Sequence, residues 1–150
     1  MMAKEMVYEK ILSFRETEKN EAQMHYQTSM EKFEAVALKL VDLLQKKEKY
    51  EEQYYRYLER NTDVSTINMY YNYLRKIEED ISQVQRKVNK ARDDMNKKQD
   101  HLTTQHVEVK KIEKIIDRKR LQLLEHEEFE ERKMMDDIST RQFLGNKGRG

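Results

Sequence analysis

Residues 1–144 contain neither glycine nor proline, the two residues that most often interrupt regular secondary structure. A β-sandwich or barrel needs turn residues about every ten positions, and a doubly wound α/β fold needs glycine-rich crossings. Both folds are therefore disfavoured, which leaves long helices, a coiled coil or a disordered chain. The 30 basic and 29 acidic side chains nearly balance, whereas disordered chains of low hydrophobicity usually carry a high net charge. The sequence thus favours long helices.

The spacing of apolar residues indicates a coiled coil. From residue 67, positions in alternating steps of three and four extend over about 60 residues, and 14 of these 18 positions are apolar or aromatic. They are Ile67, Tyr70, Leu74, Ile77, Ile81, Val84, Val88, Ala91, Met95, Lys98, Leu102, Gln105, Val109, Ile112, Ile116, Lys119, Leu123 and His126. The polar members of this row are expected to weaken the packing of the seam.

A second row of the same spacing precedes the first. It consists of Ala22, Tyr26, Ser29, Phe33, Val36, Leu40, Leu43, Lys47, Tyr50, Tyr54 and Tyr57, and Val7, Ile11 and Phe14 are expected to continue it towards the N-terminus. The steps that lead from Phe14 through Glu18 and Ala22 to Tyr26 are all fours. This spacing predicts a stutter near Glu18, where the supercoil should unwind locally.

The two rows are joined by a cluster of turn and cap residues, Asn61-Thr62-Asp63-Val64-Ser65. Asp63 or Ser65 is expected to cap the second helix, and a connection this short makes the two helices antiparallel. With the turn centred near residues 63–64, the numbers of facing residues should sum to about 127. The expected facing pairs are Tyr57 with Tyr70, Leu43 with Val84, Phe33 with Met95, Tyr26 with Leu102, Phe14 with Ile112 and Ile11 with Ile116.

We therefore predict an all-α fold, an antiparallel two-helix coiled-coil hairpin with a C-terminal helical overhang. A single coiled-coil domain is expected over residues 1–144, with a first arm at about 5–60, a turn at 61–65 and a second arm at about 66–144. Residues after about 122 should form the overhang, ending near Phe143 with Gly145 as its C′ residue and 145–150 as a flexible tail. One long dimeric rod is the alternative, and self-association into a four-helix bundle stays possible.

Composition and motifs disfavour several classes of function. The net charge of +1 argues against a nucleic-acid partner, and no cysteine is present for a thiolate nucleophile or a cysteine-based metal site. The longest apolar run, Ala35 to Leu38, is far too short to insert into a membrane. The sequence lacks phosphate-binding, dinucleotide-binding, hydrolase and HExxH motifs, and His126 with Glu130 offers only two weak metal ligands. We expect a protein that is not an enzyme and that uses no cofactor or metal.

Tyrosine is concentrated where the hairpin should turn. Seven of the nine tyrosines lie within residues 50–73. Those on the seam should pack, whereas Tyr55, Tyr71 and Tyr73 should be exposed. Exposed tyrosines at one end of a coil are typical of a protein-binding surface, although they could also close the frayed end of the coil. The partner-binding residues expected at this end are Tyr50, Tyr54, Tyr55, Tyr71 and Tyr73.

The other end carries separate basic and acidic segments. Residues 86–120 contain 12 basic and 6 acidic side chains, a net of +6, whereas residues 125–137 contain 2 basic and 7 acidic, a net of −5. The basic segment fits an acidic partner, and the methionines beyond it resemble a docking segment that adapts to varied surfaces. Alternatively, these are a solvated helix face and a frayed tail. The partner-binding residues expected here are Lys110, Lys111, Lys114, Arg118, Arg120, Met134, Met135, Ile138 and Phe143.

Three stretches resemble the flagellar FliJ family of export proteins. They are Tyr8-Glu9-Lys10-Ile11-Leu12-Ser13-Phe14-Arg15-Glu16-Thr17-Glu18, then Met95-Asn96-Lys97-Lys98-Gln99 through Glu108-Val109-Lys110-Lys111-Ile112-Glu113-Lys114, and finally Met135-Asp136-Asp137-Ile138-Ser139 with Gln142-Phe143. Size and two-arm layout are similar over nearly the whole chain. The tyrosine cluster and the glycine-rich tail depart from the family pattern.

The resemblance implies an antiparallel two-helix coil that links the flagellar export ATPase ring to the cytoplasmic domain of the export-gate membrane protein and to export chaperones. It implies a cytoplasmic protein, peripheral at the cytoplasmic face of the inner membrane at the flagellar base, and no catalytic residues. We expect the basic end to meet the ATPase and the tyrosine end to meet the gate or a chaperone. A generic cytoplasmic coiled-coil tether or scaffold is the alternative.

Overall fold

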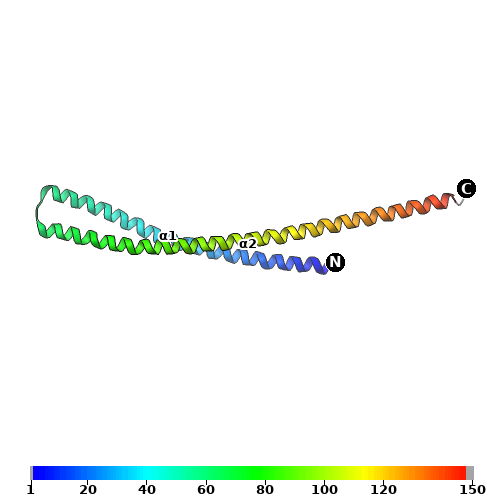
Figure 1. The fold of residues 1–150 in the computed structure, drawn as a ribbon, viewed down its shortest axis with the longest axis horizontal. Helices are drawn as coiled ribbons and strands as arrows, with labels where there is room; N and C mark the ends of the chain where they lie inside the picture. Colours follow the sequence, from blue (N-terminus) through cyan, green and yellow to red (C-terminus); the bar gives the residue numbers. More distant parts are fainter. Residues whose placement is uncertain (1, 148–150) are drawn as a thin grey trace. The chain divides into compact units, whose positions relative to one another are not determined.

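The computed structural model describes residues 2–147 and confirms the predicted all-α hairpin. Helix α1 comprises Met2–Arg60 and helix α2 comprises Val64–Lys147, and no strand occurs in this range. Figure 1 shows the chain leaving α1, turning sharply and returning as α2. Residues 148–150 of the expected tail lie outside the described residues.

The connection between the helices is Asn61–Asp63, shorter than the expected turn, because α2 already begins at Val64. Asp63 is the cap of α2. Its Oδ1 accepts a hydrogen bond from the Ser65 backbone N–H at 3.3 Å, and its Oδ2 accepts one from the Thr66 hydroxyl at 2.8 Å. A side-chain oxygen in this position satisfies a backbone donor that has no partner inside the helix. Of the two expected caps, Asp63 is therefore the one that the structure selects.

Contacts divide the chain into two compact units, each of which is described by itself. The hairpin unit is Glu18–Gln105, and the terminal unit combines the residues up to Thr17 with those from His106 onward. In the hairpin unit the most buried side chains are Ala22, Ser29, Ile77 and Val88, all of them members of the two predicted rows. Most other members of these rows are half-buried. The predicted seam is thus confirmed in this unit.

The predicted seam is wrong at the start of α1. Val7, Ile11 and Phe14 are exposed, whereas Tyr8, Leu12 and Arg15 are half-buried. The steps from Tyr8 through Leu12, Arg15 and Lys19 to Ala22 alternate four and three without interruption, so the expected stutter near Glu18 is absent. The prediction assigned the most apolar residues of this segment to the seam. The heptad phase that continues from Ala22 instead places Arg15 there. The guanidinium of Arg15 lies 4.0 Å from the Glu108 carboxylate.

The expected contact of Tyr57 with Tyr70 is confirmed, since their ring centroids lie 5.5 Å apart, but other contacts differ from the predicted register. In the hairpin unit, Tyr54 contacts Tyr70, Lys47 contacts Glu78, and the Arg92 guanidinium stacks on the Phe33 ring. The residue numbers of these pairs sum to 124, 125 and 125 respectively, which is two to three less than the expected sum of about 127. The physical reason is the turn: a three-residue connection is centred on Thr62, and twice 62 is 124.

Helix α2 extends further than predicted. It runs through Gly145 to Lys147, and Gly145 does not adopt a positive φ, so it is not a C′ residue. A glycine in an exposed helix costs only about 1 kcal/mol relative to alanine, and the residues before it are good helix formers. In the terminal unit, residues 124–146 are exposed. Figure 1 shows this segment, orange to red, continuing beyond the start of α1. We call residues 124–147 the overhang.

The corrected seam can be tested with two substitutions within one helical turn, on different sides of α1. Leu12→Ala should lower the free energy of unfolding by about 2 kcal/mol, or abolish hydrogen-exchange protection of residues 5–17, because Leu12 packs towards α2. Phe14→Ala removes a larger side chain but should change stability by less than about 0.5 kcal/mol, because Phe14 is exposed. A larger loss for Phe14→Ala than for Leu12→Ala would restore the original seam.

Candidate protein-binding surfaces

Five tyrosines form an aromatic cluster next to the turn of the hairpin unit. The Tyr70 ring lies 5.2 Å from Tyr50, 5.6 Å from Tyr54 and 5.5 Å from Tyr57, measured between centroids. Tyr73 lies closer still to Tyr50, at 4.1 Å. All these pairs are tilted, and such geometry contributes about 0.5–1.5 kcal/mol per pair beyond area burial. Tyr70 is therefore the centre of a packed cluster that holds the two helix ends together.

A second set of apolar side chains at this end points to solvent. Tyr55 is 63% exposed, Tyr71 is 58% exposed, and Leu58, Val64 and Met69 are exposed as well. We call these five residues the tip surface. Among the tyrosines predicted to bind a partner, Tyr55 and Tyr71 belong to it, whereas Tyr50 and Tyr54 are half-buried in the aromatic cluster. Tyr73 is 43% exposed and also packs on Tyr50, so it takes part in both.

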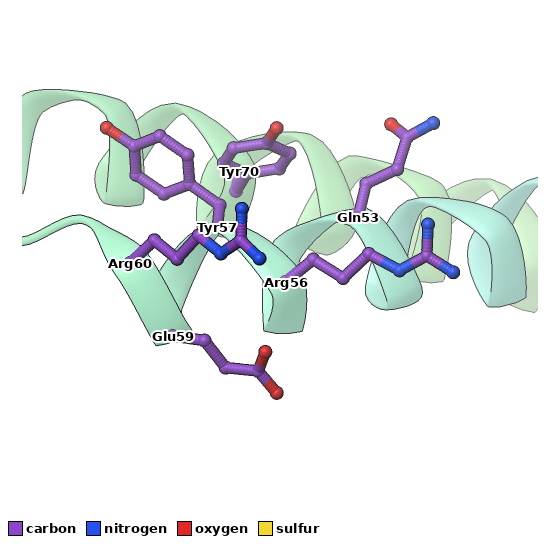
Figure 2. Close-up of a pocket in the computed structure, with 6 residues that line it drawn as sticks. All are labelled: Gln53, Arg56, Tyr57, Glu59, Arg60 and Tyr70. Carbon is purple, nitrogen blue, oxygen red and sulfur yellow. The ribbon is translucent and has the colours of Figure 1, made fainter.

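An open hollow at the end of α1 was not anticipated from the sequence. Gln53, Arg56, Tyr57, Glu59, Arg60 and Tyr70 line it. Figure 2 shows the Arg56 and Arg60 side chains extending in the same direction, with the Tyr57 and Tyr70 rings beside them. One Arg56 nitrogen lies 2.8 Å from the Glu52 carboxylate. The signal in the sequence was the pair of arginines four residues apart among the tyrosines.

The basic residues predicted near the chain ends lie in the terminal unit and are exposed. The Lys110 ammonium is 3.4 Å from Glu113 and the Lys111 ammonium is 3.3 Å from Glu108, both within α2. Arg120 lies 3.7 Å from Glu9 and joins the two helices. Lys114 and Arg118 form no ion pair within 4.0 Å with any residue of the described range. The charges of Lys114 and Arg118 are therefore the least neutralised by acidic side chains of the described range.

The overhang presents apolar side chains around an acidic helix. Met134, Met135, Ile138 and Phe143 are exposed there, as are Leu124, Phe129 and Leu144. Every residue from 124 to 146 is exposed, and none of them is half-buried. The overhang therefore shows several large apolar groups to solvent, which is typical of a segment that docks on a partner.

Two other kinds of site are absent from the described range. Across residues 2–147, no three His, Asp or Glu side chains come together as a metal site would require. Neither α1 nor α2, as far as each is described, has a stretch apolar enough to cross a membrane.

The fold defines a class of protein, an antiparallel two-helix coiled coil with exposed apolar groups at the turn, in the overhang and at intervals along both helices. A protein-family model described as "Flagellar FliJ protein" matches residues 5–148. A curated relative, the "Flagellar FliJ protein" of Bacillus subtilis (strain 168), is 34% identical over 143 residues, which cover 95% of this chain and 97% of the relative. The chain therefore belongs to the flagellar FliJ protein family. The search of solved structures gave no significant match.

Substitution of the neighbouring residues Tyr70 and Tyr71 tests which of the two side chains packs in the aromatic cluster. Tyr70→Ala should lower the free energy of unfolding by about 3 kcal/mol, because it removes three ring contacts. Tyr71→Ala should change it by less than about 0.5 kcal/mol, because the Tyr71 side chain is mostly in solvent. Urea denaturation followed by circular dichroism measures both. Equal losses would show that Tyr71 packs in solution.

Proposed function

We propose that this protein is a non-enzymatic link in the flagellar type III export apparatus, joining the export ATPase ring to the export gate and to export chaperones. As a member of the FliJ family, the chain is a component of flagellar export. The single observation that supports the linking role is the separation of exposed binding groups along the sequence. Tip-surface residues occupy 55–71, whereas the exposed basic residues occupy 110–120 and the overhang follows at 124–147.

The basic residues of the terminal unit are the proposed contact with the ATPase. Five exposed basic side chains lie within about three turns of α2. They are Lys110, Lys111, Lys114, Arg118 and Arg120. Exposed cations of this kind attract an acidic surface at long range and position it. Met134, Met135, Ile138 and Phe143 then supply the apolar contacts that electrostatics alone does not provide.

The tip surface is the proposed contact with the cytoplasmic domain of the export-gate membrane protein or with a chaperone. Tyrosine loses little conformational entropy on binding and combines an apolar ring with a polar hydroxyl, so it is frequent in interface hot spots. The aromatic cluster holds the two helix ends together, and the Tyr55 ring lies 5.8 Å from its member Tyr54, so the cluster supports Tyr55 directly. Tyr71 follows the cluster residue Tyr70 along α2. Such a role places the protein peripherally at the cytoplasmic face of the inner membrane, at the flagellar base.

Charge reversal tests the ATPase contact. Lys110→Glu with Lys111→Glu should reduce recovery of the export ATPase in a pull-down at least tenfold, because two attractive charges become repulsive. The fold should persist, since both lysines are exposed and their ion pairs within α2 are weak. Arg75→Glu with Arg86→Glu in the hairpin unit makes the same change of charge elsewhere and should leave recovery unchanged. Full recovery with the first variant would refute this end of the link.

Truncation of the two exposed tyrosines tests the other contact. Tyr55→Ala with Tyr71→Ala should weaken binding to the gate domain or to a chaperone at least tenfold, measured by isothermal titration with each purified partner. Exposed Leu38→Ala with Met24→Ala removes apolar groups elsewhere on α1 and serves as the control. Unaltered affinity of the tyrosine variant for every partner would show that the tip surface is not a binding site.

A further inference from the structure

The ion pairs of Lys47 identify which heptad positions of the two helices lie on the same side of the hairpin unit. The Lys47 ammonium lies 3.8 Å from Glu51 of α1 and 3.6 Å from Glu78 of α2. With the seam at heptad positions a and d, both glutamates occupy e positions. The e positions of the two helices therefore share one side of the coil, and the g positions share the other, as in antiparallel coiled coils generally.

The two sides differ sharply in charge. Over the helical residues of the hairpin unit, 18–60 and 64–105, the e and b positions contain two basic and four acidic residues, a net of −2. The g and c positions contain ten basic and five acidic residues, a net of +5. We call the ten basic residues the basic face; they are Lys32, Lys39, Lys46, Lys49, Arg56, Arg60, Lys76, Lys87, Lys90 and Lys97.

The basic face is accessible and largely unneutralised. All ten residues are exposed. Arg56 pairs with Glu52, but none of the eight lysines has an ion pair within 4.0 Å among residues 2–147. Lys32, Lys39 and Lys46 repeat every seventh residue, which spaces their charges about 10 Å apart along α1. The charge is therefore arranged in rows along one side of the coil.

The composition of the basic face favours a diffuse anionic surface over a specific carboxylate. Eight of its ten members are lysine, a flexible point charge, whereas arginine is the residue that recognises carboxylates by paired hydrogen bonds. Aromatic residues are not interleaved with the lysines, which disfavours single-stranded nucleic acid. At the turn end, the same side carries Met69 at a c position and Tyr73 at a g position, both exposed. Basic rows with an apolar and an aromatic anchor are typical of segments that lie on a membrane surface.

We propose that the basic face of the hairpin unit adsorbs to a bilayer surface rich in anionic phospholipid. Lysine ammonium groups meet the lipid phosphates, and Met69 with Tyr73 reaches the headgroup region. The coil lies on the surface and does not insert. The lysines and arginines of the basic face are distinct from the residues proposed above to bind the ATPase and the gate, so substitution of its lysines tests this proposal independently of them. Met69 belongs to the tip surface as well, and Tyr73 adjoins it.

The test is co-sedimentation of the full chain with vesicles of equal parts phosphatidylglycerol and phosphatidylcholine. The chain should bind these vesicles, bind them less as salt is raised, and fail to bind vesicles of phosphatidylcholine alone. Lys39→Gln with Lys90→Gln should weaken binding about 20-fold, since each lysine near an anionic membrane contributes about fivefold. Arg75→Gln with Arg86→Gln removes two charges from outside the basic face and should weaken binding less than threefold.

Three outcomes would overturn the proposal. The first is equal sedimentation with both kinds of vesicle, and the second is equal loss in the two variants. The third is binding of polyglutamate without binding of vesicles, which would assign the basic face to an acidic polypeptide instead. Circular dichroism of both variants confirms folding, which is expected because all four substituted residues are exposed.

Discussion

Burial of one row of side chains from each helix is the interaction on which the rest of this structure depends. Neither helix has a second buried face, and the most buried residues, such as Ala22, Ile77 and Val88, all belong to these rows. Because the rows follow a strict heptad phase, that phase also decides which residues flank the seam and which face solvent. The partition of charge between the two sides of the hairpin unit follows from the same phase.

The seam tolerates polar residues at a cost. Lys47 keeps its ammonium outside and binds two glutamates, and Ser29 donates its hydroxyl hydrogen to the Tyr26 carbonyl oxygen at 2.7 Å. Gln105 is less well accommodated, since its buried Oε1 accepts no hydrogen bond from any residue of the described range. A buried acceptor without a partner costs about 1–3 kcal/mol. The unpaired acceptor of Gln105 therefore destabilises the seam at that position, whereas the ring contacts of Tyr70 stabilise it near the turn.

The arrangement suits a protein that works by contact. A two-helix coil leaves most side chains in solvent, so tyrosines, lysines and methionines at chosen heptad positions become binding surfaces without disturbing the fold. Membership of the FliJ family agrees with this, because the match extends over nearly the whole of both helices. A binding role distributed along a coil depends on the phase being kept from end to end.

The sequence by itself determined the helical class, the antiparallel pairing, the turn and the overhang. These features depend on the absence of glycine and proline and on the heptad spacing, both of which can be read directly along the chain. It also predicted the exposure of Tyr55 and Tyr71, since both are off the seam. Tertiary structure decided the rest. The phase at the start of α1 put Arg15 rather than Phe14 on the seam, and the three-residue connection set facing residues to a sum near 124. Packing of Tyr73 on Tyr50 likewise required the register, because a heptad row can mesh with its partner at several offsets and only the turn and the side-chain contacts select one.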